Sequence, residues 1–238
     1  MLLWIIAALC GSFVKGLCGV GDAPVFSAIL AFAHDNKDIN PINGLFSLPV
    51  NLYITWRERK GLNRHIWLPL SAVIVAGSIV GIFLLKNIDT KTLKTVFGFF
   101  IIFIGIVMIT NELSPKKIKP SKISLAIIGL LAGLSCGLFA IGILLVVYIS
   151  QTTENMSQFR ANICAVFAVE NTVRLILLAC LGILTPPILL RALYLSPCIA
   201  IGLFLGIKSA GKLDERKARL LVMASLITSG IAIVATNL

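Results

Sequence analysis

The sequence predicts an all-α membrane protein with several transmembrane helices, and three observations support this fold class. Hydrophobic residues make up 58% of the 238-residue chain and charged residues only 13%, against roughly half and roughly a quarter in soluble domains. Mean hydropathy is +0.99. Apolar windows follow one another along the chain, and most come close to the length of about 20 residues that a helical span requires.

These apolar windows give the expected elements in chain order. They cover approximately residues 2–33, 41–56, 66–85, 93–110, 123–150, 161–181, 188–209 and 218–235. The first and fifth windows are too long for one span, and each contains a glycine-rich interruption. The second window is short and carries polar residues. The loops between the windows are too short for a folded nucleotide-binding domain.

The interruption in the first window covers residues 11–24 and reads Gly-Ser-Phe-Val-Lys-Gly-Leu-Cys-Gly-Val-Gly-Asp-Ala-Pro. Gly19 and Gly21 weaken a helix interior, Asp22 can cap a new helix, and a proline is tolerated in a first helical turn. We therefore expect two half-helices that meet at residues 20–22. In a membrane such backbone persists where protein or a water-filled cavity surrounds it, so the break indicates a site. The alternative is a kink or a close helix crossing.

Two halves of the sequence match in three places, which predicts an internal duplication. The matches, in chain order, are Gly16–Gly21 with Gly137–Gly142, Asn43–Asn51 with Asn162–Glu170, and Gly77, Gly81, Asp89 and Gly105 with Gly202, Gly206, Asp214 and Gly230. Chance supplies one such match more readily than three in the same order. We expect two homologous repeats, residues 1–113 and 123–238, joined by a basic linker at 114–122. Each repeat would hold one broken or re-entrant helical segment and three transmembrane helices.

The direction of the repeats depends on whether the broken segments cross the membrane. If both cross, eight spans result and the lysines and arginines divide almost evenly between the two faces. If both re-enter, the repeats are inverted and most basic residues, including those of the 57–64, 116–122 and 208–219 loops, share one face. The positive-inside rule favours the inverted arrangement, with that face cytoplasmic, although residues 2–19 alone almost suffice for a span. The net charge of +11 then attracts headgroups of the lipid bilayer and does not indicate nucleic-acid binding.

The restarted helices predict a site for an anionic substrate. A helix that begins inside the membrane presents unpaired N–H groups and a partial positive charge at its first turn. We expect the two restarts at Asp22–Ala23 and at Gly142–Ile143, facing each other between the repeats. Asp22 either caps its helix, which is the simpler interpretation, or is a protonatable group that couples transport to a proton.

Charged residues at membrane depth are costly and therefore informative. In this chain they are Lys15, Asp22, Glu170 and Arg174. Glu170 and Arg174 are four residues apart, so they share a helix face and can pair, either to contact substrate or only to orient the helix. Lys15 can reach Asp22 or the substrate, or extend to the membrane surface. The predicted substrate-binding residues are Gly19, Gly21, Asp22, Asn43, Asn51, Gly142, Asn162, Glu170, Asn171 and Arg174.

Neutral polar residues complete this set. Asn43, Asn51 and Asn162 follow the breaks in the two repeats and fit either ligand contacts or interhelical hydrogen bonds. The six cysteines lie in apolar segments without metal-ligand spacing and are interpreted as small buried side chains. His34 and His65 lie in separate polar loops and are expected to be solvated. The sequence therefore predicts no metal, no cofactor and no catalytic constellation, and we expect a protein that is not an enzyme.

Taken in order, the segments Gly16–Pro24, Cys136–Gly142 and Phe159–Asn171 resemble the sulfite exporter TauE/SafE family, also called the toluene sulfonate uptake permease family. The resemblance covers nearly the whole chain and includes its length and its duplication. It implies a secondary transporter in a prokaryotic inner membrane that moves sulfur-containing anions such as sulfite, thiosulfate or organosulfonates.

The family motif Ser-Gly-Leu-x-Gly-Ile-Gly-Gly-Gly would fall on residues 15–23 and 136–144. Lys15 and Cys136 stand where the motif has a small polar residue, and Asp22 stands where it has a glycine. The leading hypothesis is a secondary transporter coupled to protons or to the membrane potential, with the homo-oligomeric state left open. The alternative is a membrane scaffold that holds a partner protein and shows no ligand-dependent thermal stabilisation.

Overall fold

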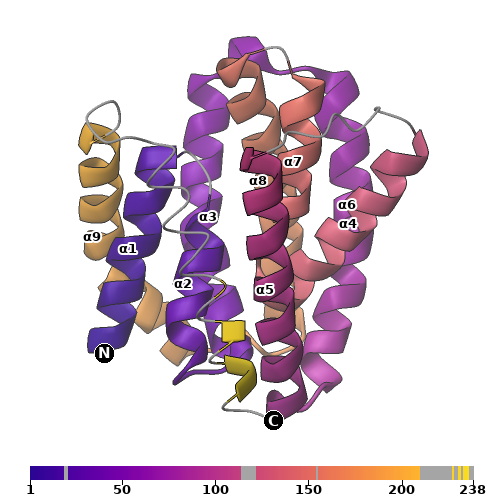
Figure 1. Ribbon diagram of the computed structural model, residues 1–238. Coiled ribbons are helices and arrows are strands. Elements are labelled where there is room, and N and C mark those ends of the chain that lie inside the picture. Colours follow the sequence, from indigo (N-terminus) through magenta and orange to yellow (C-terminus); the bar gives the residue numbers. More distant parts are fainter. Residues whose placement is uncertain are drawn as a thin grey trace. The chain divides into compact units, whose positions relative to one another are not determined.

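The computed structural model describes residues 1–18, 21–113, 122–153, 155–209, 227, 230–231 and 233–235. All regular structure in these ranges is helical (Figure 1), which confirms the predicted fold class. The elements, in chain order, are α1 (Leu2–Cys18), α2 (Asp22–Ala31), α3 (Asn36–Arg57), the short 3-10 helix η1 (Arg59–Gly61), α4 (Arg64–Asn87), α5 (Thr90–Leu113), α6 (Lys122–Phe139), α7 (Ile143–Thr152), α8 (Met156–Cys180) and α9 (Pro186–Ser209). Gly19, most of the predicted linker and most of the last apolar window lie outside the described residues.

Both long apolar windows break where the sequence predicts. The first gives α1 and α2, and the second gives α6 and α7. Gly21, just before α2, has a φ of 99°, a left-handed conformation that glycine adopts without steric penalty. At the second break Ala140 has a φ of 60°, and its N–H donates to the carbonyl of Cys136 at 2.8 Å. α6 therefore ends with a left-handed cap.

The prediction that Asp22 caps the helix after the first break is wrong. Gly21 is the N-cap residue of α2 and makes no side-chain cap, while Asp22 is the first helical residue. An acidic residue in the first turn still complements the positive end of the helix. Asp22 Oδ2 also lies 2.8 Å from Lys15 Nζ of α1, so of the three alternatives for Lys15 the structure shows the contact with Asp22.

Three helices among the described residues are long and apolar enough to cross a membrane: Arg64–Asn87, Ser157–Cys180 and Pro186–Ser209. Shorter apolar helices occupy Leu2–Gly16, Asp22–Ala31 and Leu125–Phe139. Many large hydrophobic side chains on these helices are exposed, as expected for surfaces that face lipid. These helices indicate a membrane protein. The number of crossings and the orientation stay predictions.

The second apolar window forms a longer helix than its apolar part suggests. α3 is one helix of 22 residues and continues through Pro41 and Pro49. A proline removes one intrahelical hydrogen bond and usually ends or bends a helix, and the polar residues before Pro41 lie outside the apolar window. They are helical, with Asp38 in the first turn, where a carboxylate is favourable. Asn40 is consequently held on a helix.

Residues Met1–Ile39, Ile88–Pro115 and Pro186–Leu238 form one compact unit, called unit 1 here. In this unit α1 packs against α9 and α2, and α2 contacts α5. A Cβ atom on Gly16 of α1 would lie 2.5 Å from the backbone oxygen of Leu203. The two helices therefore touch through their backbones at this glycine.

An aromatic cluster in unit 1 joins α1 to its neighbours. Trp4 is 1% exposed, and its ring centroid lies 6.0 Å from that of Phe26 and 4.8 Å from that of His34. Arg191 of α9 lies over the Trp4 ring at 4.9 Å and 3.7 Å from Asp38. His34 is thus half-buried, and the expectation of a solvated side chain is wrong. Burial, and then the charge of Arg191, lower the pKa of His34 below its ordinary value.

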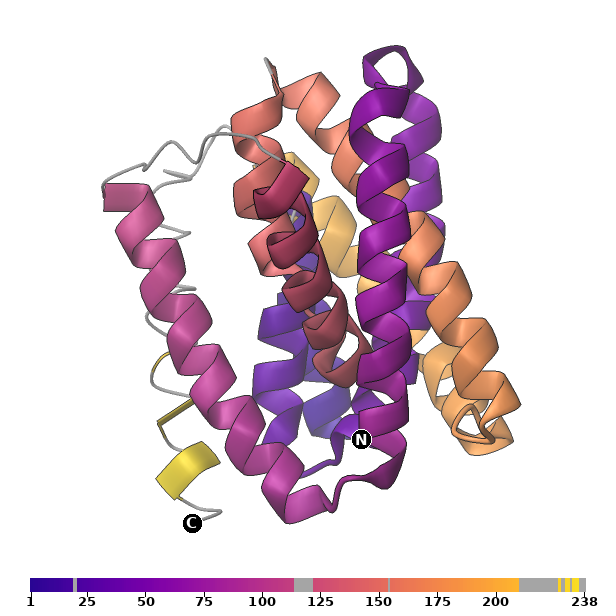
Figure 2. The same ribbon diagram turned by 90° about the vertical axis from the view of Figure 1, so that its right-hand side faces the viewer.

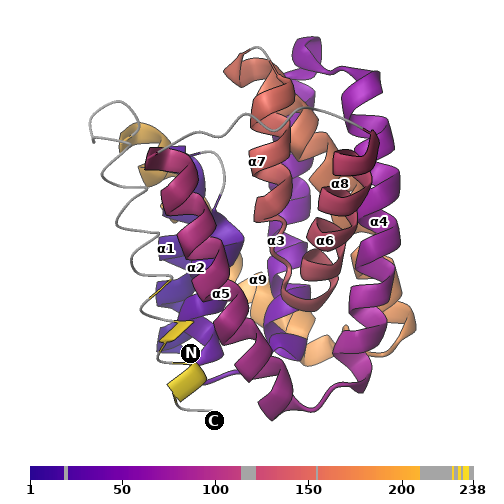
Figure 3. The ribbon, with the colours of Figure 1, turned by 45° about the vertical axis from the view of Figure 1, so that its right-hand side comes forward.

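Residues Asn40–Asn87 and Lys116–Thr185 form the second compact unit, unit 2. Within it α4 packs against α6 and α8, and α7 packs against the same two helices (Figure 3). Glycines at the predicted helix-packing spacing make the main contact: Gly77 and Gly81 of α4 face Gly133 and Gly137 of α6. A Cβ atom on Gly81 would lie 2.5 Å from the backbone oxygen of Leu134, so α4 and α6 approach as closely as backbones allow.

Each unit draws helices from both halves of the sequence. Unit 1 combines α1, α2 and α5 of the first half with α9 of the second, and unit 2 combines α4 and most of α3 with α6, α7 and α8. The two halves are therefore not separate compact bodies. The duplication itself, and the expectation that the two helix restarts face each other, stay predictions.

Candidate functional site

Helix α8 places three polar side chains in the interior of unit 2. Glu170, Asn171 and Arg174 are 1%, 3% and 2% exposed, and their spacing puts them on one side of the helix. α8 starts with a side-chain cap, in which Asn155 Oδ1 accepts a hydrogen bond from the backbone N–H of Gln158. Arg174 Nε lies 3.4 Å from Glu170 Oε1. The predicted pairing of these two charged residues is confirmed.

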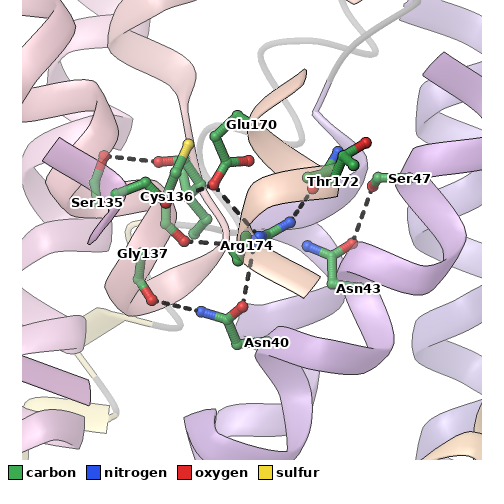
Figure 4. Close-up of polar contacts among 12 residues, drawn as sticks. Asn40, Asn43, Ser47, Ser135, Cys136, Gly137, Glu170, Thr172 and Arg174 are labelled. Carbon is green, nitrogen blue, oxygen red and sulfur yellow. Dashed lines mark hydrogen bonds and ion pairs between the residues drawn. The ribbon is translucent and has the colours of Figure 1, made fainter. Parts of the chain in front are cut away.

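The guanidinium of Arg174 also contacts two other helices (Figure 4). Its Nη1 donates to Asn40 Oδ1 of α3 at 3.0 Å and to the carbonyl of Cys136 in the last turn of α6 at 3.4 Å. Its Nη2 donates to Asn171 Oδ1. A cation beside the last carbonyls of α6 complements the negative end of that helix. One side chain thus joins α3, α6 and α8.

Two further hydrogen bonds complete the buried network. Asn40 is fully buried, and its Nδ2 donates to the carbonyl of Gly137 at 2.8 Å. Ser78 of α4 is also buried, and its Oγ donates to Glu170 Oε1 at 2.7 Å. A buried charge is tolerated only when it is paired and hydrogen-bonded, and Glu170 meets both conditions.

Two donors at the network have no hydrogen-bond partner among the described residues: Asn43 Nδ2 and Arg174 Nε. Nε keeps only its ion-pair contact with Glu170. Asn43 is 4% exposed, its Oδ1 accepts from Ser47 Oγ at 3.4 Å, and its amide nitrogen points toward Arg174 (Figure 4). Buried donors without a partner cost free energy. An oxygen atom that accepts from both would remove that cost.

The second helix restart lies beside this network. Gly142 is the N-cap residue of α7 and provides no side-chain cap. Ser135 Oγ donates to the carbonyl of Ile141 at 2.7 Å and holds the break together. A Cβ atom on Gly142 would lie 2.8 Å from Cys136 Sγ, and the Cys136 carbonyl accepts from Arg174. The uncapped start of α7 and the buried guanidinium are therefore neighbours.

A family model described as Sulfite exporter TauE/SafE matches residues 3–233 of the chain. The chain belongs to the TauE/SafE family. No curated protein and no solved structure gives a match. The family is one of membrane sulfite exporters, so the resemblance inferred from the glycine motifs is confirmed and the chain is a membrane transport protein.

In this TauE/SafE protein the first break has an ion pair of its own. Lys15 and Asp22, joined at 2.8 Å, are 8% and 21% exposed at their side chains. The pair lies in unit 1, where Asp22 opens α2 directly after Gly21. The carboxylate that stands in place of a motif glycine is thus compensated by the lysine that stands in place of the small polar residue.

Two predicted asparagines lie away from the Arg174 network. Asn162 Nδ2 donates to the carbonyl of Gly61 at 3.1 Å, and its Oδ1 accepts from the backbone N–H of Asn63 at 3.0 Å. Asn162 therefore binds the turn between α3 and α4 to α8. Of the two alternatives for this residue, ligand contact or interhelical hydrogen bond, the structure shows the hydrogen bonds. Asn51 is also buried, and it lies about two helical turns after Asn43 on α3. None of these positions has been tested for ligand binding, so the predicted set stays a prediction.

Sequence reasoning missed Asn40, the residue that links Arg174 to the end of α6. Asn40 precedes Pro41 and lies outside the apolar window, so the hydrophobic pattern does not place it on a helix. A usable signal is its spacing from Asn43, because residues three apart share a helix face.

The cysteine prediction is partly wrong. Cys136 and Cys164 are buried, whereas Cys10 and Cys180 are exposed. Cys180 is four residues after the exposed Ile176, so both lie on a face of α8 that no described helix covers. Among the described residues no group of three His, Cys, Asp or Glu side chains could hold a metal ion.

Proposed function

We propose that this TauE/SafE protein is a secondary transporter of small sulfur-containing anions, such as sulfite, thiosulfate or organosulfonates, in a prokaryotic inner membrane. The observation that supports this most directly is Arg174, a buried guanidinium at the end of a broken helix. Ionisable residues inside membrane proteins are costly and mark ion or substrate pathways. The family supplies the substrate class, and Arg174 supplies a group that would bind it.

The donors around Arg174 suit a sulfur oxyanion. A guanidinium can give two parallel charge-assisted hydrogen bonds to two oxygens of one anion. Arg174 Nε and Asn43 Nδ2, which have no hydrogen-bond partner among the described residues, offer further donors on the same side of the network. The uncapped N-terminus of α7 adds partial positive charge nearby. Together these groups would replace part of the water that the anion loses.

Glu170 competes with the anion for Arg174. Its carboxylate lies 3.4 Å from Arg174 Nε. The substrate must therefore displace this carboxylate or bind while the carboxyl group of Glu170 is uncharged. A proton on Glu170 would remove this competition, and Ser78 Oγ could then accept a hydrogen bond from the protonated carboxyl, because a hydroxyl both donates and accepts. Proton-coupled transport through Glu170 follows as part of the proposal, with Asp22 of unit 1 as a second carboxylate that could carry a proton.

The test is flux of labelled sulfite and thiosulfate in proteoliposomes. Arg174→Gln is expected to lower the flux about tenfold to a hundredfold, because a hydrogen bond to a charged group contributes about 1.5–3 kcal/mol. Arg160→Gln is the matched control, since it removes the same charge from an exposed position on α8. Its flux should equal that of the wild type.

Different outcomes separate the parts of this proposal. Unchanged flux in Arg174→Gln would remove this residue from the pathway but leave the substrate class intact. No flux of any sulfur oxyanion by the wild type would contradict the substrate class. A copurifying partner together with no anion-dependent thermal shift would favour the scaffold alternative.

A further inference from the structure

The turn between α3 and α4 lies at one end of unit 2 (Figure 2), and its sequence is rich in basic residues. Four cations lie within eight residues and are exposed: Arg57, Arg59, Lys60 and Arg64. None of them forms an ion pair with any residue that the structure describes. The one carboxylate of this turn, Glu58, accepts a hydrogen bond from Ser157 Oγ at 2.6 Å. The turn therefore carries uncompensated positive charge.

The backbone of this turn is held in place. Asn162 of α8 bonds to the backbone of Gly61 and of Asn63 on the two sides of the turn. Gly61 packs so closely that a Cβ atom would lie 3.0 Å from the backbone of Gln158. The basic side chains therefore project from a fixed frame, which lowers the ordering cost of binding a ligand.

A groove opens beside the charges. A cavity of about 430 Å³ is lined by Leu62, Arg64, Trp67 and Leu68, and its size lies within the range of small-molecule sites. Of the described residues that line it, three are apolar and one carries a guanidinium. This combination suits a ligand with an anionic end and an apolar end, such as a phospholipid.

The start of α4 adds to the attraction for an anion. α4 begins at Arg64 and has no acidic residue in its first turn, so a cation lies at the positive end of the helix. Asn63 Oδ1 accepts from the backbone N–H of His65 at 3.0 Å, which caps one of the first N–H groups. An anion near Arg64 would relieve the unfavourable pairing of this cation with the helix dipole.

Exposed aromatic residues place the turn at a membrane surface. Trp56 is 64% exposed and Tyr53 is 56% exposed, and Arg59 lies 5.4 Å from the centre of the Trp56 ring. Tryptophan and tyrosine are enriched at the level of the lipid headgroups. α4, which begins at this turn, is apolar and long enough to cross the membrane.

We propose that this basic and aromatic turn binds one anionic phospholipid, with its phosphate held by Arg59 and Arg64 and an acyl chain lying along Trp67 and Leu68. Juxtamembrane clusters of lysine and arginine attract anionic lipids with about 1 kcal/mol per cation, which corresponds to about a fivefold change in affinity. The cavity and its apolar lining add a defined place for the lipid to this charge attraction. The proposal does not depend on the transported substrate.

The experiment is a titration of the purified full-length protein in neutral detergent with phosphatidylglycerol or phosphatidylcholine of the same acyl chains, followed by native mass spectrometry. Phosphatidylglycerol should bind at least tenfold more tightly. Arg59→Gln and Arg64→Gln should each weaken phosphatidylglycerol binding about fivefold. Lys91→Gln, which removes an exposed charge at the start of α5, should leave binding unchanged.

A measurement on the wild type covers the case that the variants do not fold. Brominated phosphatidylglycerol should quench the fluorescence of Trp56 and Trp67 more than brominated phosphatidylcholine at equal concentration. Equal binding of the two lipids, or equal binding by the wild type and both arginine variants, would overturn the proposal. Inorganic phosphate should give no shift of the unfolding temperature. If inorganic phosphate shifted the unfolding temperature as much as phosphatidylglycerol does, the proposal would be overturned as well, because the site would then bind any phosphate.

Discussion

Asn40→Ala is expected to loosen the joint between α3, α6 and α8. The side chain accepts from Arg174 Nη1 at 3.0 Å and donates to the Gly137 carbonyl at 2.8 Å. A hydrogen bond to a charged group contributes about 1.5–3 kcal/mol, and an interhelical bond between neutral groups in a membrane protein about 0.6 kcal/mol. The free energy of unfolding should therefore fall by about 2–4 kcal/mol, mostly through the bond to Arg174.

Asn40→Asp separates the two bonds. The aspartate keeps an oxygen for Arg174 but loses the donor to Gly137, so its loss of stability should be smaller than that of Asn40→Ala. The added carboxylate would compete with an anionic substrate for the guanidinium. We expect the flux of this variant to fall by a larger fraction than its free energy of unfolding.

The assay is unfolding in mixed detergent and SDS micelles, followed by circular dichroism, on Asn40→Ala, Arg174→Gln and the double variant. A double-mutant cycle isolates the interaction between the two side chains. The coupling should be about 1.5–3 kcal/mol. Additivity within about 0.5 kcal/mol would show that the two residues do not stabilise each other and would refute the reasoning.

Three further predictions use thermal unfolding in detergent. Gly137→Ala should cost about 1–3 kcal/mol because its Cβ would collide with the backbone of α4, and Gly129→Ala less because its nearest atoms belong to a valine side chain. Asp89→Asn should destabilise at neutral pH, since the Thr92 N–H donates to Asp89 and lowers its pKa; this difference should fade as pH falls through the folded-state pKa. His34→Gln should flatten the pH dependence of the free energy of unfolding. Burial lowers the pKa of His34, so the wild type loses stability as pH falls below about 6.5.

Each of these predictions has an outcome that would contradict it. Equal unfolding temperatures for the two glycine variants would show that the contact between α4 and α6 tolerates a side chain at either position. Parallel stability curves from pH 3 to 7 for Asp89→Asn and the wild type would show that the charge of the cap contributes nothing. A His34→Gln variant with the wild-type slope near pH 6.5 would assign that slope to another group.

The breaks could be predicted from the sequence because their causes are local. Glycines inside an apolar window weaken a helix wherever it packs, and both long windows are broken as expected. The Glu170–Arg174 pair was equally predictable, since four residues of helix bring two side chains together. The partners of these groups were not, because Asn40 reaches Arg174 across 134 positions of the chain and depends on α3 continuing through Pro41. A sequence shows that a buried amide needs partners but not where they lie.

Glycines at two helix crossings, α1 with α9 and α6 with α4, connect helix packing to the buried Arg174 network. In unit 1 the broken helix α1 crosses α9, with Gly16 against Gly206, and in unit 2 the broken helix α6 crosses α4, with Gly137 against Gly81. These glycines match in the predicted alignment of the two halves, and each broken helix packs on a helix of the other half. Gly137 also offers its carbonyl to Asn40. The residue that lets α4 approach is therefore the residue that fixes the end of α6, and with it the position of the buried guanidinium.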